Sequence, residues 1–193
     1  MKKLILILLI AFSLQTFGQG NFFWSHNDNL GCPNIGDSYG GGIVAYLFGS
    51  ADAGYVSGEC HGIIVANTDQ STGATWYNGS NIEVFFTTAN IGEGQYNTSY
   101  IYNAQGAGTY AATLCLDYSN GGFSDWFLPS YGDVTKFNAL LLLGIGGFVS
   151  GDLYWTSTEG DATRAYLKDI YLPGTAYLFA KSSSAKVRAA RYF

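Results

Sequence analysis

The chain has 193 residues and a formal net charge of −5, with 12% charged and 17% aromatic residues. This composition excludes an intrinsically disordered protein, because the apolar surface is large enough to offset the entropy lost on ordering. Glycine is frequent, with 26 residues, and proline is rare, with 3. Such a balance favours long, turn-rich loops on a scaffold that contains β-strands.

The first residues have the order of a secretory signal peptide. Met1-Lys2-Lys3 is basic, Leu4–Phe12 is apolar, and small residues end the segment at Gly18. The apolar run is shorter than the roughly 20 residues that a membrane-spanning helix needs. We therefore expect a signal peptide over residues 1–18, cleavage before Gln19, and a secreted or cell-surface protein that inserts in no membrane afterwards.

The charges are distributed unevenly along the chain. No Lys or Arg occurs between Gln19 and Thr135, a segment with ten of the 14 acidic residues, whereas the basic residues beyond Lys3 all lie at or after Lys136. A nucleic-acid-binding protein needs a denser basic face, so we expect no nucleic-acid partner. The late basic residues either pair with carboxylates of the acidic segment, which we favour, or form a strip for an anionic glycan.

Residue patterns predict short strands on both sides of two helices. The predicted strands are Ile43–Phe48, Gly62–Ala66, Val84–Thr87, Leu153–Thr156, Ala165–Tyr171, Ala176–Ala180 and Lys186–Phe193. The first helix covers Thr109–Tyr118, with Thr109 as its cap. The second begins at Ser130, which forms a capping box with Asp133, and ends at Gly144. This order of elements indicates a single domain of the α+β class.

No residue pattern indicates catalysis, a cofactor or a metal. Cys60 and His61 are adjacent, so on a strand they point to opposite faces and form no nucleophile–base pair. Zinc requires four convergent ligands, and their spacing is missing. Gly106–Ala111 matches a dinucleotide fingerprint by letter, yet no βαβ unit surrounds it, so it predicts only the approach to a helix. We expect a protein that is not an enzyme.

The large aromatic residues are predicted to divide between core and surface. Trp126 and Trp155 lie in predicted short strands or beside them and are expected in the core. Trp24 and Trp76 lie in loop-like segments and are better candidates for exposure. Three cysteines in an exported protein predict one disulfide and one free thiol, and any two of the three form the pair.

Glu159 follows a run of small hydroxyl residues and resembles an active-site carboxylate in isolation, but no second carboxylate accompanies it at a fixed spacing. We expect a structural role instead, in a buried ion pair with a basic residue of the last predicted strand. Strand alternation places Arg191 on the apolar face of that strand, so Arg191 is the predicted partner. A bulge in the strand would replace it with Arg188.

Three separated blocks carry a resemblance to a known family. They are Gly121–Ser130 (GGFSDWFLPS), Tyr154–Glu159 (YWTSTE) and Val187–Phe193 (VRAARYF), with further similarity at Gly40–Leu47 and Asp69–Trp76. In this order they resemble the Lcl C-terminal domain family of secreted bacterial domains. The resemblance covers Ile35–Phe193 and leaves residues 19–34 as an N-terminal extension. It implies a C-type-lectin-like fold, with two helices packed on short, mostly antiparallel strands and with long loops.

The resemblance also implies a function and its alternatives. The expected role is a non-enzymatic, adhesin-like binding module for a glycan or a protein ligand. The calcium-binding motifs of C-type lectins (Glu-Pro-Asn and Trp-Asn-Asp) are missing, so the usual calcium-dependent sugar site is not expected. An enzyme related to the sulfatase-modifying oxidases, which need two closely placed reactive cysteines, is one alternative. A purely structural module of the cell envelope is the other.

Two further expectations follow from the family fold. The strand at Ile43–Phe48 and the closing strand should be neighbours in one sheet. The ligand surface should be built by the loops Gly144–Asp152 and Glu159–Arg164, where Asp161 and Arg164, with Lys168 on the following strand, are the candidate ligand-binding residues. Family members often carry a cysteine directly after the residue that matches Trp76, and the resemblance implies that it pairs with the residue matching Cys115. Tyr77 stands at that place here, which leaves Cys32 or Cys60 as the partner of Cys115.

Overall fold

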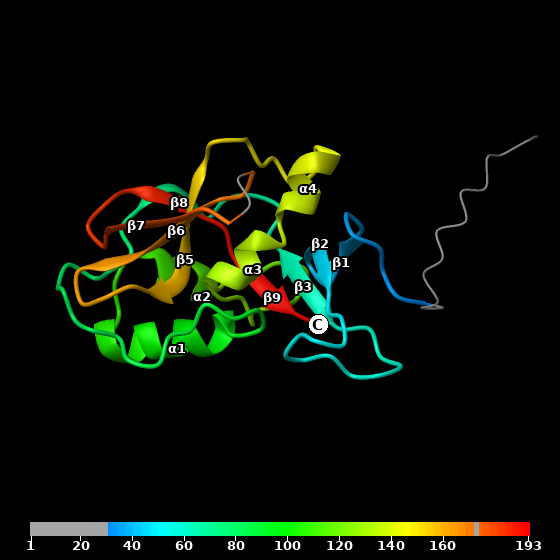
Figure 1. Ribbon diagram of the computed structural model, residues 1–193, viewed down its shortest axis with the longest axis horizontal. Helices are drawn as coiled ribbons and strands as arrows, with labels where there is room; N and C mark the ends of the chain where they lie inside the picture. The colour runs from blue at the N-terminus through cyan, green and yellow to red at the C-terminus, as the bar shows by residue number, and fades with distance from the viewer. Residues whose placement is uncertain (1–30, 172–173) are drawn as a thin grey trace, which may run out of the picture. The chain divides into compact units, whose positions relative to one another are not determined.

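The computed structural model describes residues 31–171 and 174–193, which belong to one unit from Gly31 to Phe193. The predicted signal peptide, the cleavage site before Gln19 and Trp24 lie outside the described residues. The described part combines four helices with two sheets of mostly antiparallel strands, which confirms the predicted α+β class (Figure 1).

The first sheet is built from both ends of the unit. Its strands, in spatial order, are β1 (Ser38–Tyr39), β2 (Gly42–Leu47), β3 (Gly62–Val65) and β9 (Ala190–Tyr192). All of its pairs are antiparallel. β2 and β9 were expected to be neighbours, which is wrong: they share the sheet, but β3 lies between them.

The second sheet is formed mainly by the C-terminal half of the chain. Its strands, in spatial order, are β4 (Ser71–Ala74), β8 (Ala185–Val187), β5 (Leu153–Glu159), β6 (Arg164–Asp169) and β7 (Ala176–Ala180). Only the contact between β5 and β8 is parallel among these pairs. The single closing strand predicted at Lys186–Phe193 is therefore wrong, because the chain crosses from one sheet to the other at Arg188. The guanidinium of Arg188 stabilises this crossing by donating to the carbonyl oxygens of Ala66 (2.9 Å) and Gly146 (2.8 Å).

The two central strands of the first sheet, β2 and β3, are buried on both faces. Alternate residues of β2 and β3 point to opposite sides, so Val44 and Ile64 pack into one apolar cluster while Ile63 and Val65 pack into the other. This double burial explains why both strands are nearly continuous apolar runs rather than alternating ones.

Three tryptophans occupy the first of these two clusters. Trp126 and Trp155 are buried, as predicted. The predicted exposure of Trp76 is wrong, since its side chain is fully buried and its Nε1–H donates to the carbonyl oxygen of Thr156 (2.8 Å). A loop residue can thus bury its indole ring where a strand carbonyl oxygen accepts the hydrogen bond of the indole N–H.

The four helices are α1 (Gly94–Gln105), α2 (Ala111–Leu116), α3 (Tyr131–Thr135) and α4 (Asn138–Leu143). The helix predicted from Ser130 to Gly144 is divided into α3 and α4, but both of its ends are confirmed. The backbone N–H of Asp133 donates to Ser130 Oγ (3.0 Å), and Gly144 ends α4 in the left-handed conformation. α2 begins after Tyr110 rather than after Thr109.

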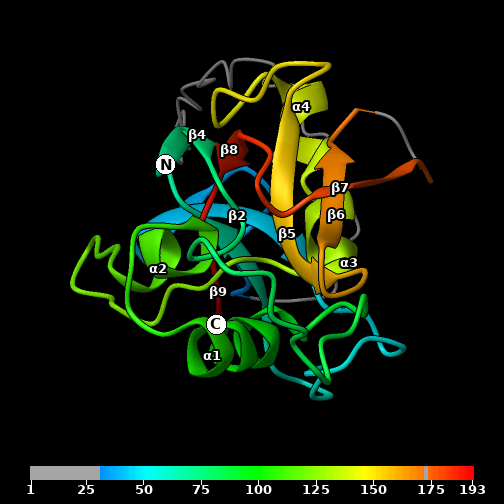
Figure 2. The same cartoon turned by 90° about the vertical axis from the view of Figure 1, so that its left-hand side faces the viewer.

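α1 is the longest of these helices and was not predicted. It lies below the five-stranded sheet in Figures 1 and 2. Its buried residues are mostly polar, among them Asn97 and Thr98, so no apolar stripe marks it in the sequence. Thr98 Oγ1 donates to the carbonyl oxygens of Gly94 (2.7 Å) and Leu128 (3.0 Å), which satisfies its buried hydroxyl.

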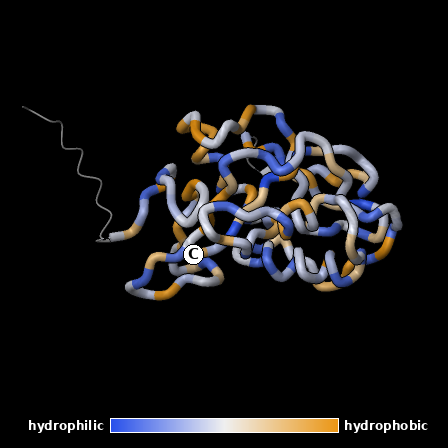
Figure 3. The backbone as a smooth tube through the Cα atoms, turned by 180° about the vertical axis from the view of Figure 1, so that it is seen from behind, coloured by the Kyte–Doolittle hydropathy of each residue, from blue (hydrophilic) through white to orange (hydrophobic). Residues whose placement is uncertain are grey.

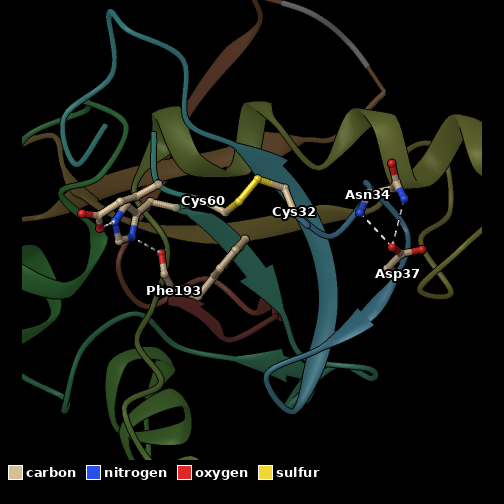
Figure 4. The surroundings of a disulfide bond; sticks show 7 residues. Cys32, Asn34, Asp37, Cys60 and Phe193 are labelled. Carbon is tan, nitrogen blue, oxygen red and sulfur yellow. Dashed lines mark hydrogen bonds and ion pairs between the residues drawn. A yellow bond between two sulfur atoms is a disulfide. The ribbon is translucent and has the colours of Figure 1, made fainter. Parts of the chain in front are cut away.

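One disulfide joins Cys32 to Cys60 and closes the chain around β1, β2 and the β2–β3 loop (Figure 4). The remaining cysteine, Cys115, is buried, and burial raises the pKa of its thiol. Pairing of Cys115 with Cys32 or Cys60, as the resemblance implied, is therefore wrong. Within residues 31–171 and 174–193, no helix has the length and apolarity to cross a membrane.

Candidate functional site

Most basic residues of the C-terminal half are used in ion pairs. Arg188 Nε lies 2.6 Å from Asp69 Oδ1, and Arg191 Nε lies 2.8 Å from Asp125 Oδ1. Both carboxylates belong to the acidic part of the sequence, which confirms the pairing interpretation of the charge distribution. The predicted pair of Glu159 with Arg191, and the alternative with Arg188, are both wrong. The guanidinium of Arg191 holds the pKa of Asp125 below its usual value.

The three charged residues expected to bind a ligand do not form one accessible surface. The segment between Glu159 and Arg164 is a tight turn rather than a long loop, and Arg164 Nε donates to Asp161 Oδ2 (2.8 Å). Lys168 is only 1% exposed, and its Nζ lies 5.9 Å from the centre of the Tyr131 ring. Lys168 is therefore withdrawn from the expected surface, whereas Asp161 and Arg164 remain an exposed ion pair.

A different surface stands out by its exposed aromatic rings. We call it the aromatic strip, and it consists of Phe85, Phe86, Tyr100 and Tyr96. The ring of Phe86 lies 6.3 Å from that of Phe85 and 5.9 Å from that of Tyr100, measured between centroids. Tyr96 and Tyr100 are four residues apart on α1 and therefore project from the same helix face. Figure 3, which colours the backbone by hydropathy, shows hydrophobic segments in outer loops as well as in the interior.

Phe86 has the most unusual conformation in the strip. Its φ angle is +72°, and no other non-glycine residue in the described part of the chain has a positive φ. The left-handed conformation costs a residue with a side chain about 1–2 kcal/mol. This residue is also 79% exposed, so burial of the ring does not offset the strain. Strained backbone residues cluster at active sites, ligand clamps and switch regions. The positive φ of Phe86 interrupts an extended backbone, so the strand predicted at Val84–Thr87 is wrong.

The strained segment is held firmly on both sides of the two phenylalanines. Before them, the backbone N–H of Val84 donates to both carboxylate oxygens of Glu159, at 2.9 and 2.8 Å. After them, Thr88 and the side chain of Asn97 exchange two hydrogen bonds, of 2.9 and 2.7 Å. Both anchoring side chains are largely buried, so the rings are presented by a rigid segment.

Glu159 is itself fixed by a buried lysine. Lys181 Nζ donates to Glu159 Oε1 and to the carbonyl oxygen of Ile82 (2.8 Å), and it lies 4.7 Å from the centre of the Trp76 ring. Burial raises the pKa of Glu159, and the hydrogen bond from Lys181 opposes that rise. The predicted structural role of Glu159 thus has a concrete form, which is to hold the loop that carries the aromatic strip.

The strip continues into a pocket at the N-terminal end of α1. The cavity has a volume of about 290 Å³. It is lined by Phe48, Ala53, Gly54, His61, Gly92, Glu93, Tyr96, Tyr192 and Phe193. Tyr96 belongs both to this lining and to the strip, so the two features are adjacent.

The structure supplies no arrangement of residues for metal or thiol chemistry in its described part. No group of three or more His, Cys, Asp and Glu side chains converges there. Cys60 is bonded to Cys32, and the neighbouring His61 is occupied by Glu59, whose Oε2 lies 2.9 Å from His61 Nε2.

Replacing Phe86 tests the strain directly. The variant Phe86→Gly should be more stable than Phe86→Ala by about 1 kcal/mol, because only glycine adopts a positive φ without steric penalty. Urea denaturation of the two variants, followed by tryptophan fluorescence, measures this difference. If Phe86→Ala is as stable as Phe86→Gly or more stable, the left-handed conformation is not present in solution.

Sequence reasoning missed the strip, although one signal was available. Phe85 and Phe86 are adjacent, and adjacent residues of an extended segment point to opposite sides, so in a strand with one solvent-facing side one of the two rings would be exposed. The tyrosines at positions 96 and 100 have helical spacing, but they are exposed on α1 beside the buried Asn97 and Ile101. No protein-family model matches this chain, and no curated protein matches it.

Proposed function

We propose that the protein is a secreted or surface-exposed, non-enzymatic binding module whose aromatic strip binds a neutral glycan. The observation that carries this proposal is Phe86, a largely exposed ring held in a strained conformation by buried anchors on both sides. A rigid platform loses little entropy when a ligand binds, which increases affinity.

The chemistry of the strip suits sugar rings. A pyranose has an apolar face of C–H groups and a rim of hydroxyls. The ring faces of Phe86 and Tyr100 can stack on the apolar face, and the tyrosine hydroxyls can form hydrogen bonds with the sugar hydroxyls. Burying about 80 Å² of ring surface contributes about 2 kcal/mol, so two or three stacked rings give a measurable affinity. No Lys or Arg belongs to the strip, which favours a neutral glycan over an anionic one.

The resemblance to the Lcl C-terminal domain family supports the same proposal. We propose a C-type-lectin-like fold over Ile35–Phe193, with an N-terminal extension and a signal peptide before it. The shared sheet of the N-terminal hairpin and β9 agrees with that fold. In this chain the ligand surface would be formed by the loop before α1 and by α1 itself, rather than by the β5–β6 turn.

The cysteines favour binding over an oxidase activity. An enzyme related to the sulfatase-modifying oxidases would need two reactive thiols close together. Here Cys32 and Cys60 form a disulfide, and Cys115 is fully buried with a raised pKa, so its thiol is a poor nucleophile.

A glycan array with the purified protein tests the proposal. Neutral oligosaccharides should be retained, and their binding should persist in EDTA and in 0.5 M salt, at which screening removes most ionic attraction. Binding restricted to sulfated or uronic-acid glycans, lost in salt, would contradict it. So would loss of all binding in EDTA.

A further inference from the structure

The pocket at the N-terminal end of α1 is enclosed mainly by aromatic rings. Four rings come from three places: Phe48 follows β2, Tyr96 lies in the first turn of α1, and Tyr192 ends β9 with Phe193 directly after it. His61 Nδ1 lies 2.9 Å from the backbone oxygen of Phe193, which ties two of the lining residues together (Figure 4). Several rings around a small cavity form a cage whose faces carry partial negative charge.

The walls of this cage are fixed before any ligand arrives. The hydroxyl of Tyr192 donates to Asp133 Oδ2 (2.8 Å) and accepts from the backbone N–H of Gly94 (2.9 Å). The ring of Phe48 packs 5.8 Å from that of Tyr192 and also against Gly54, where an added Cβ would lie 3.1 Å from Phe48 Cε2. A preformed cavity of this kind needs little reorganisation to bind.

The charges at the pocket are predominantly negative. Glu93 lines the cavity, and within residues 31–171 and 174–193 its carboxylate forms no ion pair and no capping hydrogen bond. His61 also lines the cavity, but Glu59 lies 2.9 Å from its Nε2 and balances the charge of the protonated imidazole. No Lys or Arg contributes to the lining. The partial positive charge at the α1 N-terminus is a structural reason for a carboxylate at position 93. It does not explain the aromatic rings that surround the cavity beside Glu93.

We propose that this pocket binds the alkylammonium head of a small organic cation. The aromatic faces attract a cation that keeps an apolar surface, and Glu93 supplies the opposite charge. Anions are disfavoured by the carboxylates, and an inorganic cation would lack the convergent oxygen ligands that it requires. The shared chemistry is an amino or quaternary ammonium group, carried either by an amino sugar or by a choline-like compound. This inference depends on the pocket alone and not on glycan binding by Phe86.

Calorimetric titration with choline and with its neutral isostere 3,3-dimethylbutan-1-ol tests the proposal. Choline should bind at least about tenfold more tightly, because the two probes share shape and differ in charge. Glucosamine compared with N-acetylglucosamine, in which the amine is a neutral amide, provides the second arm. Tighter binding of choline assigns a quaternary ammonium ligand, and tighter binding of glucosamine assigns an amino sugar. Equal binding of the charged and neutral members in both pairs, or no binding of either cation, overturns the proposal.

Variants separate this pocket from the strip. Glu93→Gln should weaken binding of the preferred cation about tenfold, because it removes the charge and keeps the shape. Glu83→Gln is the matched control, since Glu83 is an exposed acid outside the lining, and it should leave the affinity unchanged. Phe86→Ala should also leave cation binding unchanged. If the Glu93→Gln protein binds the cation as tightly as the parent, the charge of Glu93 does not contribute to cation binding in the pocket.

Discussion

The variant Lys181→Ala is expected to lower the free energy of unfolding by about 3–5 kcal/mol, because it leaves a buried carboxylate without its partner. The side chain of Lys181 is fully buried and that of Glu159 is 6% exposed, so water replaces the lost ammonium poorly. The loop with Phe85 and Phe86 should loosen as well, since Glu159 holds Val84. Urea denaturation measures the loss of stability.

Two controls identify the cause of that loss. Arg164→Ala removes a basic residue from an exposed pair and should leave the unfolding midpoint nearly unchanged. The double variant Lys181→Met/Glu159→Gln removes both charges and keeps an acceptor for Val84, so it should recover most of the stability. A Lys181→Ala protein that unfolds at the midpoint of the parent would show that Glu159 and Lys181 are not a buried pair.

Removal of the disulfide is expected to have an effect of similar size. The bond between Cys32 and Cys60 closes a segment with a sequence separation of 28. The double variant Cys32→Ser/Cys60→Ser should lose about 3–4 kcal/mol, chiefly because the unfolded chain gains conformational entropy. Urea denaturation of the parent in a reducing agent should reproduce this loss, and the reducing agent should not affect the double variant. Equal stability of the oxidised parent and the double variant would contradict the assignment.

The parts of the fold that the sequence predicted are those with a local physical signature. β2 and β3 were recognisable because strands buried on both faces need continuous runs of apolar, β-branched residues. The start of α3 was recognisable because Ser130 and Asp133 satisfy backbone groups only at a helix N-terminus. Trp126 and Trp155 followed from the same reasoning, since large aromatic residues near short strands fill the core.

The parts that were missed depend on contacts distant in the sequence. α1 turns Asn97 and Thr98 inward, and their hydrogen bonds with Thr88 and Leu128 are not encoded in any local periodicity. The partner of Glu159 was misassigned because Lys181 follows β7, two strands away from β5 in the sheet. Trp76 was assigned to the surface because its loop looks polar, yet the loop crosses a strand backbone that accepts its indole N–H.

The candidate site was missed for a related reason. Charge was the surface signal that the sequence analysis followed, and it led to Asp161, Arg164 and Lys168. Folding buries Lys168 and pairs Arg164, whereas it exposes rings that composition alone would place in the core. Exposure of an apolar side chain becomes visible only once the anchors on either side of it are known.

Calorimetric titration of the Phe86→Ala variant with the neutral oligosaccharide that the glycan array ranks first tests the central claim most directly. Its affinity should fall at least tenfold below that of the parent, since truncating an aromatic anchor commonly costs about 2 kcal/mol. Tyr171→Ala is the matched control: Tyr171 is 49% exposed, lies outside the strip and should leave the affinity unchanged. If Phe86→Ala binds the oligosaccharide as tightly as the parent and Tyr171→Ala do, the aromatic strip is not the glycan-binding surface.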